Sequence, residues 1–455
     1  MANPLRSNRP GGAERPRVLI IGAGFAGFHC ARALDRRLGA TADLVLVNPV
    51  DHMVYTALLP DVAGGVLDAR WIATPLAASL PFTRVLVGTV TAIDTGAHTC
   101  AVRGADGREE LLAWDRLVLN PGSVTRTMGV AGVLEHAHGF KTLAEALYLR
   151  ERILRQLQFA SATTDRHARE RHSSFVVVGG GFTGLELAAQ GRQLSRAALR
   201  QYRALDSESV RWTVLEAGPS VLGQFPANLA RRALDRIRKR GVDVRLGAAV
   251  AEIGPNHVRL ASGETLPTQT VVWTAGVTPA PLISELGLPV QRGRLIVGDH
   301  LQTRDHPDVY ALGDAAAVPD LTHPGQLAAQ TAQHAQRQGV TAAHNVAASL
   351  GHGKARAYKH HDLGFTVDLT GRNAVATPLG VRLSGVLAKV AGRAYHLWAL
   401  PSGRLRVLSD WINAVIGGRR IVALGLIDER YATIQAEANG GGAIGPTRPV
   451  KRTSA

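Results

Sequence analysis

The sequence predicts an α/β protein with two separate parallel-sheet units and a smaller C-terminal domain. Two observations predict the units. An apolar run leads into a glycine-rich turn and a helical pattern from Arg17 to Arg37, and the same order of features recurs from Ser174 onward. A change of pattern after residue 350 predicts the third part. Each unit is therefore expected to be Rossmann-like, and the C-terminal domain is expected to hold a small antiparallel element and amphipathic helices.

Composition excludes several classes of protein. The chain has 455 residues, of which 45% are hydrophobic and 19% charged, which argues against a disordered, collagen-like or coiled-coil chain. Its two cysteines, Cys30 and Cys100, cannot form a disulfide framework or CxxC metal ligands. The 17 histidines follow no metal-binding spacing, so no metal centre is expected. Residues 1–17 lack the apolar core of a signal peptide, and no apolar run is long enough to cross a bilayer.

The net charge of +16 indicates an anionic partner, either nucleic acid or a membrane surface. Aromatic residues make up only 5% of the chain, which is little for a protein that stacks on bases. Residues 351–455 hold 15 Lys and Arg against 6 Asp and Glu, and residues 1–17 add a net +3. The excess charge lies mainly near the ends of the chain. No nucleic acid is expected, and at this point an anionic bilayer and scattered arginines without a partner both remain open.

The first glycine-rich turn follows the apolar strand Arg17–Ile21. In a G-x-G-x-x-G turn, glycines permit a tight bend and let a pyrophosphate approach the N-terminus of the next helix. A second strand, Asp43–Val47, ends at Asn48, 26 residues after the first glycine. Asn48 is expected to bind a ribose, or else only to open the Asn-Pro turn. The other candidate cofactor-binding residues here are Gly22, Gly24, Phe25, Ala26 and Gly27.

The second turn begins 157 residues after the first and follows the strand Ser174–Val178. The next strand, Arg211–Leu215, ends at Glu216, whose carboxylate would accept both ribose hydroxyls and repel a 2′-phosphate. This turn therefore favours NADH over NADPH, unless Glu216 is only a solvated residue at a strand end. The other candidates are Gly179, Gly181, Phe182, Thr183 and Gly184. Two such turns in one chain indicate a flavoprotein with FAD at the first and NADH at the second.

A third segment, Thr303–Asp314, reads TRDHPDVYALGD and precedes three alanines expected to open a helix. It resembles a motif of the two-dinucleotide-domain FAD reductases, which implies that Gly313 and Asp314 hold FAD. Asp314 could alternatively be a plain helix N-cap. The run Val271–Val277, which contains the candidate NADH residue Gly276, matches that family's crossover between domains. No cysteine pair is present, so the electron acceptor is not expected to be a thiol.

A closer resemblance is to the type II NADH dehydrogenases, the single-subunit NADH:quinone oxidoreductases. The stretches that carry it span residues 17–340 and are Asn48–Gly65, His138–Arg150, Gly179–Ala188, Val271–Val277, Val309–Ala316 and Leu327–Gly339. The resemblance implies that Glu186 lies beside the stacked nicotinamide and flavin and assists hydride or proton transfer. It also implies that Gln330, Gln333 and His334 form the quinone side of the site, although His334 stands where the family usually has Gln. A polar helix surface is the alternative. Lys141 matches a family lysine of unassigned role.

The C-terminal region carries two apolar stripes at helical spacing. The stripes are Leu383, Val386, Leu387, Val390, Leu397 and Trp398, then Leu408, Trp411, Ile412, Val415 and Ile416, with Arg404, Arg406, Arg419 and Arg420 as flanking arginines. Such stripes pack on protein or lie in a membrane interface. The family resemblance favours the membrane.

The sequence thus predicts a FAD-dependent, non-proton-pumping NADH:quinone oxidoreductase, peripheral on the cytoplasmic face of the cell membrane and possibly a homodimer. The alternatives are a soluble NADH-dependent reductase of a ferredoxin- or rubredoxin-like protein and a slow-turnover NADH/FAD sensor. The expected FAD-binding domain comprises residues 17–150 and 276–350, and the NADH-binding domain residues 151–275. Residues 351–438 are expected to associate with the membrane, and residues 1–16 and 439–455 to be disordered.

Overall fold

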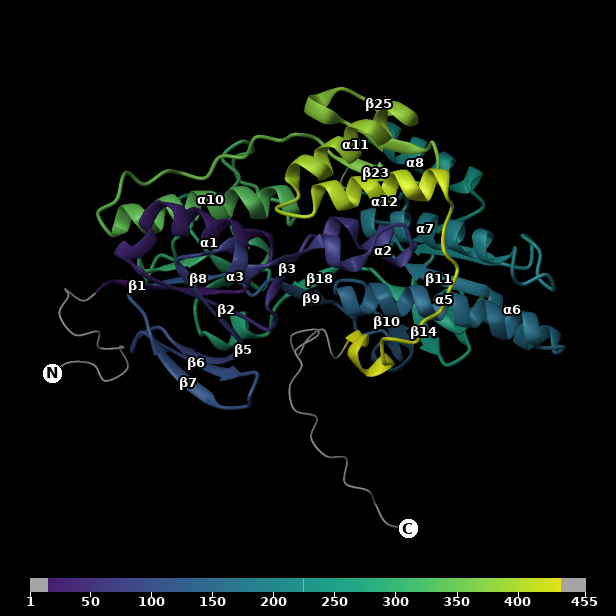
Figure 1. The fold of residues 1–455 in the computed structure, drawn as a ribbon, viewed down its shortest axis with the longest axis horizontal. Helices are drawn as coiled ribbons and strands as arrows, with labels where there is room; N and C mark the ends of the chain where they lie inside the picture. The colour runs from purple at the N-terminus through teal and green to yellow at the C-terminus, as the bar shows by residue number, and fades with distance from the viewer. Residues whose placement is uncertain (1–14, 224, 435–455) are drawn as a thin grey trace, which may run out of the picture.

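The computed structural model describes residues 15–223 and 225–434. The predicted disordered N-terminus, up to residue 14, and the predicted tail 439–455 lie outside these described residues. The described part confirms the α/β class: parallel strands form two sheets, helices cover them, and a C-terminal domain lies against both (Figure 1).

The first sheet has the strand order β21-β8-β1-β2-β5-β6-β7. Its strands are β1 (Arg17–Ile21), β2 (Asp43–Asn48), β5 (Thr83–Asp94), β6 (Thr99–Gly104), β7 (Glu109–Ala113), β8 (Arg116–Leu119) and β21 (Val309–Ala311). The strands from β21 to β5 are parallel, and β5, β6 and β7 are antiparallel. Helix α1 (Phe25–Leu38) packs against α10 (Ala332–Ser349). Strand β21 and helix α10 return to this sheet after the second unit is complete.

The second sheet is parallel throughout, in the order β10-β17-β11-β12-β13. Its strands are β10 (Ala137–His138), β11 (Ser174–Val178), β12 (Arg211–Glu216), β13 (Asp243–Leu246) and β17 (Thr270–Trp273). The helices of this unit are α5 (Leu143–Ala162), α6 (Arg166–Ser173), α7 (Phe182–Ala198) and α8 (Ala227–Lys239). The central strand β11 is buried along its whole length, as a parallel strand with covered faces requires.

Smaller elements join the two units. Strand β9 (Ser123–Thr125) pairs with β18 (Val277–Pro279), and a separate sheet contains β14 (Val250–Gly254), β15 (His257–Leu260) and β16 (Thr265–Pro267). Strands β20 (Arg294–Ile296) and β22 (Ala316–Ala317) are parallel, and β19 (Val290–Gln291) pairs with β20. The short pair β3 (His52–Val54) and β4 (Ala73–Pro75) flanks helix α2 (Leu59–Ala63). The remaining short helices are α3 (Leu76–Ser79), α4 (Val133–His136) and α9 (Leu282–Glu285).

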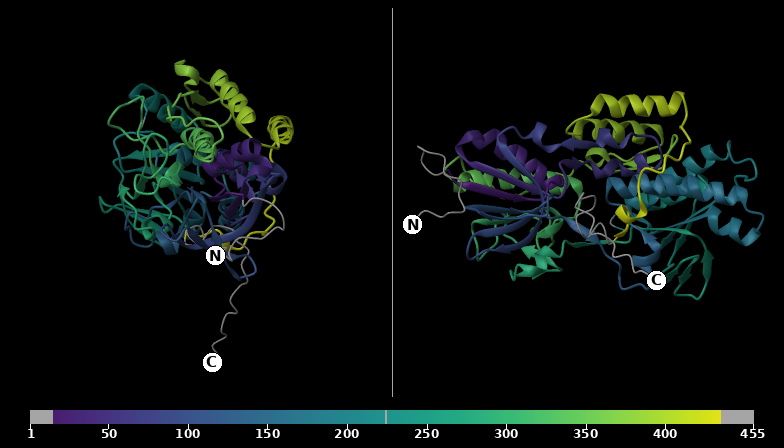
Figure 2. Two further views of the ribbon diagram at one scale, coloured as in Figure 1. Left: turned by 90° about the vertical axis from the view of Figure 1, so that its left-hand side faces the viewer. Right: turned by 60° about the horizontal axis from the view of Figure 1, so that its bottom comes forward.

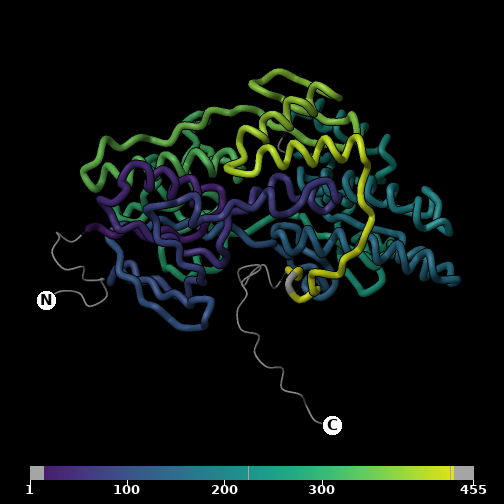
Figure 3. The backbone as a smooth tube through the Cα atoms, in the orientation of Figure 1, coloured from purple at the N-terminus to yellow at the C-terminus, as the bar shows by residue number. Residues whose placement is uncertain are grey.

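The C-terminal domain lies above the junction of the two units (Figure 1). Strands β23 (Thr366–Asp368), β24 (Ala374–Ala376) and β25 (Leu383–Ser384) form an antiparallel sheet, followed by helices α11 (Val386–Ala399) and α12 (Arg404–Ile416). Figure 2 shows the two helices side by side on the outside of the molecule. After α12 the chain descends across the second unit (Figure 3) and bridges from Thr433 to His138.

Two local predictions are wrong. Residues Ala315–Ala317 do not open a helix, because Gly313 turns the backbone at φ +62° into a 3-10 turn and the chain continues as β22. Leu383 belongs to β25 rather than to an amphipathic helix, since Gly385 (φ +73°) ends the strand before α11 begins.

Candidate active site

The first glycine-rich turn joins β1 to α1, and its three glycines have different surroundings. Gly22 has φ +91°, and a Cβ there would overlap the carbonyl oxygen of Asn120. A Cβ at Gly27 would overlap the carbonyl of Gly22. A Cβ at Gly24 would have only the Asn120 side chain near it, 3.7 Å away. The fold therefore needs Gly22 and Gly27, whereas Gly24 leaves open space at a helix N-terminus, where a pyrophosphate fits.

Asn48 lies beside this turn at the end of β2. Its Oδ1 accepts the backbone N–H of Ala23 at 2.8 Å, and its Nδ2 donates to the carbonyl of Val50 at 2.8 Å. The amide thus connects the strand end to the glycine turn and also forms the expected local turn. Phe25 is half-buried and Ala26 is buried, so this part of α1 contributes mainly backbone N–H groups to a ligand.

Asp314 is held by a chain of polar groups from other elements. The hydroxyl of Ser123 donates to Asp314 Oδ2 at 2.6 Å, and the ammonium of Lys141 donates to both oxygens of Ser123. Next to Asp314, the N–H of Gly313 is accepted by Gln338 Oε1 at 2.7 Å. Asp314 lies in a 3-10 turn, so the N-cap alternative is wrong. Lys141, whose role the sequence did not assign, supports Asp314 through Ser123.

The second turn repeats the arrangement between β11 and α7. Gly179 has φ +109°, and its Cβ would come within 2.9 Å of Thr274, the residue that follows β17. A Cβ at Gly184 would overlap the carbonyl of Gly179, while one at Gly181 would meet no atom within 4 Å. Among the described residues no side chain caps α7 at Gly181. The second turn therefore also leaves its middle glycine open to an anionic ligand.

Glu216 corresponds to Asn48 in the second unit. Its Oε2 accepts the N–H of Gly180 and its Oε1 that of Gly218, both at 2.7 Å. The carboxylate is half-buried, so Glu216 is not merely a solvated residue at a strand end. Its negative charge lies directly beside the open glycine of the turn.

An aromatic cluster covers the start of α7. Phe182 packs edge-to-face on Phe225 with ring centres 4.8 Å apart, and Phe225 lies 3.8 Å from Phe365 of the C-terminal domain. Thr183 is exposed beside it. Gly276, with φ +93°, lies in the loop after β17, and its N–H bonds to the carbonyl of Thr274, the neighbour of Gly179. The second turn, the loop after β17 and the C-terminal domain therefore meet in one region.

The three predicted quinone-side residues do not share a helix face. Helix α10 begins at Ala332, and Thr331 caps it by accepting the N–H of His334. Gln330 therefore precedes the helix, and its amide lies 3.4 Å from the carbonyl of Asp314. Gln333 donates to the carbonyl of Gly364 at 2.5 Å. The spacing of three and four residues suggests a common helix face, but Thr331 caps the start of α10, so Gln330 lies outside the helix.

His334 belongs to a cluster that the sequence did not reveal. Only 8% of its surface is exposed, and its Nδ1 lies 2.8 Å from the hydroxyl of Tyr358. The His360 ring stacks on it with centres 3.6 Å apart. Burial lowers the pKa of His334 and lowers that of His360 to about 4. The spacing of the histidines gives no sign of this stacked pair. Residues 354–365 lie in an irregular segment, whose packing no periodicity predicts.

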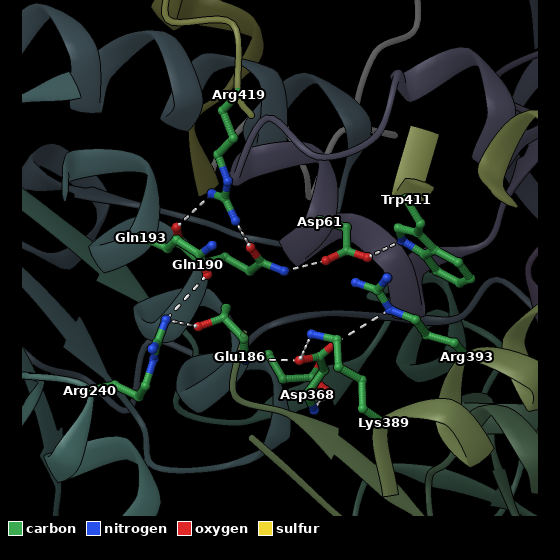
Figure 4. A network of polar contacts seen from close by, with 11 residues as sticks. Asp61, Glu186, Gln190, Gln193, Arg240, Asp368, Lys389, Arg393, Trp411 and Arg419 are labelled. Atoms are coloured by element: carbon green, nitrogen blue, oxygen red, sulfur yellow. Dashed lines mark hydrogen bonds and ion pairs between the residues drawn. The ribbon is translucent and has the colours of Figure 1, made fainter. Parts of the chain in front are cut away.

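Glu186, in the first turns of α7, enters a buried polar network between both units and the C-terminal domain (Figure 4). Its Oε1 accepts the N–H of Asp368 at 2.7 Å. Asp368 forms an ion pair with Lys389 at 3.0 Å and lies 3.8 Å from Arg393. Burial, together with the negative charges of Asp368 and Asp61, raises the pKa of Glu186 well above its ordinary value.

Asp61 is the residue of this network that sequence reasoning missed. It lies on α2, is only 6% exposed, and lines the same cavity as Glu186. Burial raises its pKa. A signal was present, because Asp61 is a charged residue inside the apolar run Leu58–Ala63.

Comparisons with known proteins agree with this geometry. The family model described as pyridine nucleotide-disulphide oxidoreductase matches residues 16–339. The chain is 30% identical to the type II NADH:quinone oxidoreductase Ndh of Mycobacterium tuberculosis, over 94% of this chain and 96% of the relative. It is 31% identical to the demethylphylloquinone reductase NdbB of Synechocystis, over 89% of this chain and 97% of the relative. The fold matches that of NDH2 from Plasmodium falciparum solved with NADH, with a TM-score of 0.83, 18% identity, and coverage of 90% of this chain and all of that one.

Proposed function

The chain belongs to the pyridine nucleotide-disulphide oxidoreductase family and, within it, to the type II NADH:quinone oxidoreductases, and from this premise we propose how its residues carry out the transfer of electrons from NADH to a quinone. One observation carries the proposal. Two glycine-rich turns in one chain each leave the middle glycine, Gly24 or Gly181, open at a helix N-terminus. Glu186, which accepts the N–H of Asp368, lies on the second of these helices.

The residues of the first unit fit FAD. The open space at Gly24 suits a pyrophosphate, Asn48 lies where a ribose hydroxyl would bind, and Asp314 is fixed in position to hold the ribityl chain. FAD bound here would supply hydride and electron transfer between NADH and a quinone, chemistry that side chains lack. Ser123 and Lys141 hold Asp314 at its carboxylate.

The second unit binds NADH. The backbone N–H groups at Gly181 and the N-terminal end of α7 attract the pyrophosphate, and Glu216 accepts the ribose hydroxyls. Because the Glu216 carboxylate is held beside the turn, it would repel the 2′-phosphate of NADPH. Phe182, which packs on Phe225, lies at the start of α7, the helix that also carries Glu186.

On the acceptor side, the amides of Gln330 and Gln333 orient the quinone, and Glu186 and His334 are the candidate groups that hold protons. Burial lowers the pKa of His334, so its imidazole is neutral at pH 7, whereas burial raises the pKa of Glu186 and favours its protonated form. Glu186 is therefore the better proton donor.

Stopped-flow absorbance tests the function. NADH is expected to bleach the flavin absorbance rapidly, NADPH slowly, and a short-chain quinone is expected to restore it rapidly. The two alternatives make different predictions. Recovery only with an iron–sulfur protein would identify a soluble carrier reductase, and slow bleaching would identify a sensor.

A surface of apolar side chains supports peripheral membrane binding. We name this surface, made by α11, α12 and the loops beside them, the C-terminal apolar surface. Its exposed members are Leu379, Val381, Val386, Leu387, Val390, Trp398, Leu405, Leu408, Ile412, Val415 and Ile416. No helix in the described ranges is long and apolar enough to cross a bilayer. Large exposed apolar patches bind lipid or protein, and the basic C-terminal region favours anionic lipid. The proposed location is the cytoplasmic face of the cell membrane.

The structure corrects the composition of the predicted stripes. The Trp411 ring is buried and its Nε1 donates to Asp61 at 2.8 Å, so Trp398, 67% exposed, is the tryptophan of this surface. Arg419 faces inward and donates to Gly64 and Gln190, so it is not a flanking arginine. The spacing of apolar residues identifies the apolar face of a helix, but it does not show which residues of that face pack on protein and which are exposed.

Replacing Leu405, Val415 and Ile416 together by serine is expected to weaken binding to anionic vesicles at least about tenfold, because these side chains are 78–82% exposed and would lose their contact with acyl chains. Vesicle flotation measures this. The matched control replaces Phe82, Leu111 and Phe159, which are also exposed but lie elsewhere. Equal loss in both triple variants would contradict the membrane surface. Sedimentation of the lipid-free protein would show whether the same surface forms the possible homodimer instead.

A further inference from the structure

A chain of hydrogen bonds connects the segment after α12 to the buried carboxyl of Asp61 (Figure 4). The Arg419 guanidinium donates to Oε1 of Gln190 at 2.8 Å and to the carbonyl of Gly64 at 2.5 Å. The Nε2 of Gln190 donates to Oδ1 of Asp61. The other oxygen of Asp61 accepts the indole N–H of Trp411 at 2.8 Å. The chain therefore joins α2, α7, α12 and the loop that follows α12.

Arg419 fixes the orientation of the Gln190 amide in this chain. A guanidinium can only donate, so the amide oxygen of Gln190 must face Arg419 and its NH₂ group must face Asp61. Indole N–H is also only a donor. Both oxygens of Asp61 thus accept hydrogen bonds, and among its partners in the described residues none accepts from a carboxylic O–H. This pattern suits the carboxylate, even though burial by itself favours the protonated form.

Asp61 and Glu186 line one cavity of about 20 Å³, which has room for one water molecule. The negative charge of Asp61 acts on Glu186 in the direction of keeping its proton. The other titratable or charged groups around Glu186 are Asp368 on β23, Lys389, Arg393 and His396 on α11, Arg240 after α8, and Arg419. Burial lowers the pKa of His396 to about 4, so this ring is neutral at pH 7.

We propose that Asp61 is a positioning residue for Glu186: Arg419, acting through Gln190, keeps Asp61 ionised, and ionised Asp61 keeps Glu186 protonated. This inference rests on the proposed function. In that reaction, NADH, one proton and quinone give NAD⁺ and quinol. The hydride brings two electrons and one hydrogen, so one further proton is required. Glu186 supplies that proton to a quinone oxygen, becomes a carboxylate, and is reprotonated by the H⁺ that the overall reaction takes from bulk solvent.

The test is the pH dependence of the rate at which a short-chain quinone restores flavin absorbance in the full-length, FAD-loaded protein. In the wild type the rate is expected to fall as pH rises through the pKa of Glu186, because only the protonated group donates. Asp61→Asn removes the negative charge with little change of shape. In this variant the fall of the rate with pH, the falling limb of the profile, is expected about one pH unit lower than in the wild type. The rate at low pH should be unchanged.

Variants of Arg419 test the rest of the chain. Arg419→Gln is expected to move the limb in the same direction by a smaller amount, since Asp61 then gains a proton more easily. Arg419→Lys keeps a cationic donor for Gln190 and should restore the wild-type profile. Arg420→Gln, at an exposed neighbouring arginine, is the matched control and should leave the profile unchanged.

Infrared spectroscopy gives a readout that is independent of turnover. The carbonyl band of protonated Glu186 is identified as the band that Glu186→Gln lacks. This band should persist to higher pH in the wild type than in Asp61→Asn. The inference would be overturned if, in Asp61→Asn, neither the falling limb of the rate profile nor the pH at which the carbonyl band disappears differed from the wild type. A wild-type rate without a falling limb would also overturn it, as would an Asp61→Asn rate lowered equally at every pH, which would indicate a structural role. Failure of the proposed function looks different, because quinone would then restore no absorbance at any pH.

Discussion

Replacing Gly181 by valine is expected to raise the KM for NADH at least about 100-fold while the protein remains folded and retains its flavin. A Cβ at residue 181 would meet no protein atom within 4 Å, and the backbone there has an ordinary negative φ of −75°. The backbone therefore accepts a Cβ at this residue without a clash. The side chain would instead occupy the space where a pyrophosphate approaches the helix N-terminus. Charge-assisted hydrogen bonds contribute about 1.5–3 kcal/mol each, so loss of two of them exceeds the factor of 100.

Steady-state kinetics with NADH measures the effect, while flavin absorbance and the melting temperature show that the rest of the protein is intact. Gly96→Val is the matched control, since Gly96 is also spacious but lies in the exposed turn between β5 and β6. Gly184→Val should behave differently and lower stability, because its Cβ would overlap the carbonyl of Gly179. An unchanged KM in Gly181→Val would mean that NADH does not bind at this turn.

The glycine-rich turns could be predicted because the features that define them are local. A strand, three glycines at fixed spacing and a helix lie within about twenty residues, and the backbone strain that glycine relieves is present at Gly22 and Gly179. The atoms that enclose those glycines could not be predicted. Asn120 and Thr274 follow strands that pair with β1 and β11 only in the folded sheet, about a hundred residues away along the chain.

The candidate site was predicted as single residues and not as a network. Glu186 and Asp314 were found through a family resemblance, but their partners Asp368 and Ser123 lie 182 and 191 residues away. Trp411 illustrates the limit most clearly. Its spacing matches its apolar neighbours on α12, yet its indole N–H requires a buried acceptor and finds it in Asp61. The spacing of apolar residues does not predict that the Trp411 indole needs a hydrogen-bond acceptor.

Replacing Glu186 by glutamine is expected to slow reoxidation of the flavin by quinone about 100-fold while reduction by NADH changes only a few-fold. Hydride transfer depends on the geometry of the two rings and needs no acid. Formation of quinol needs a proton, and a positioned acid typically contributes a factor of about 100 or more. Glutamine can still accept the N–H of Asp368, so the local fold should persist, but it has no proton to donate.

Stopped-flow measurement of the two half-reactions separates these effects. Glu151→Gln is the matched control, since Glu151 is also buried but lies on α5 and accepts the N–H of Gly425. The defect in Glu186→Gln should be largest below the raised pKa of Glu186, where the wild type holds the proton, and should shrink as pH rises above it and the wild type loses that proton. A defect of the same size at every pH would assign Glu186 to quinone orientation, and His334 would then be the remaining candidate for the proton.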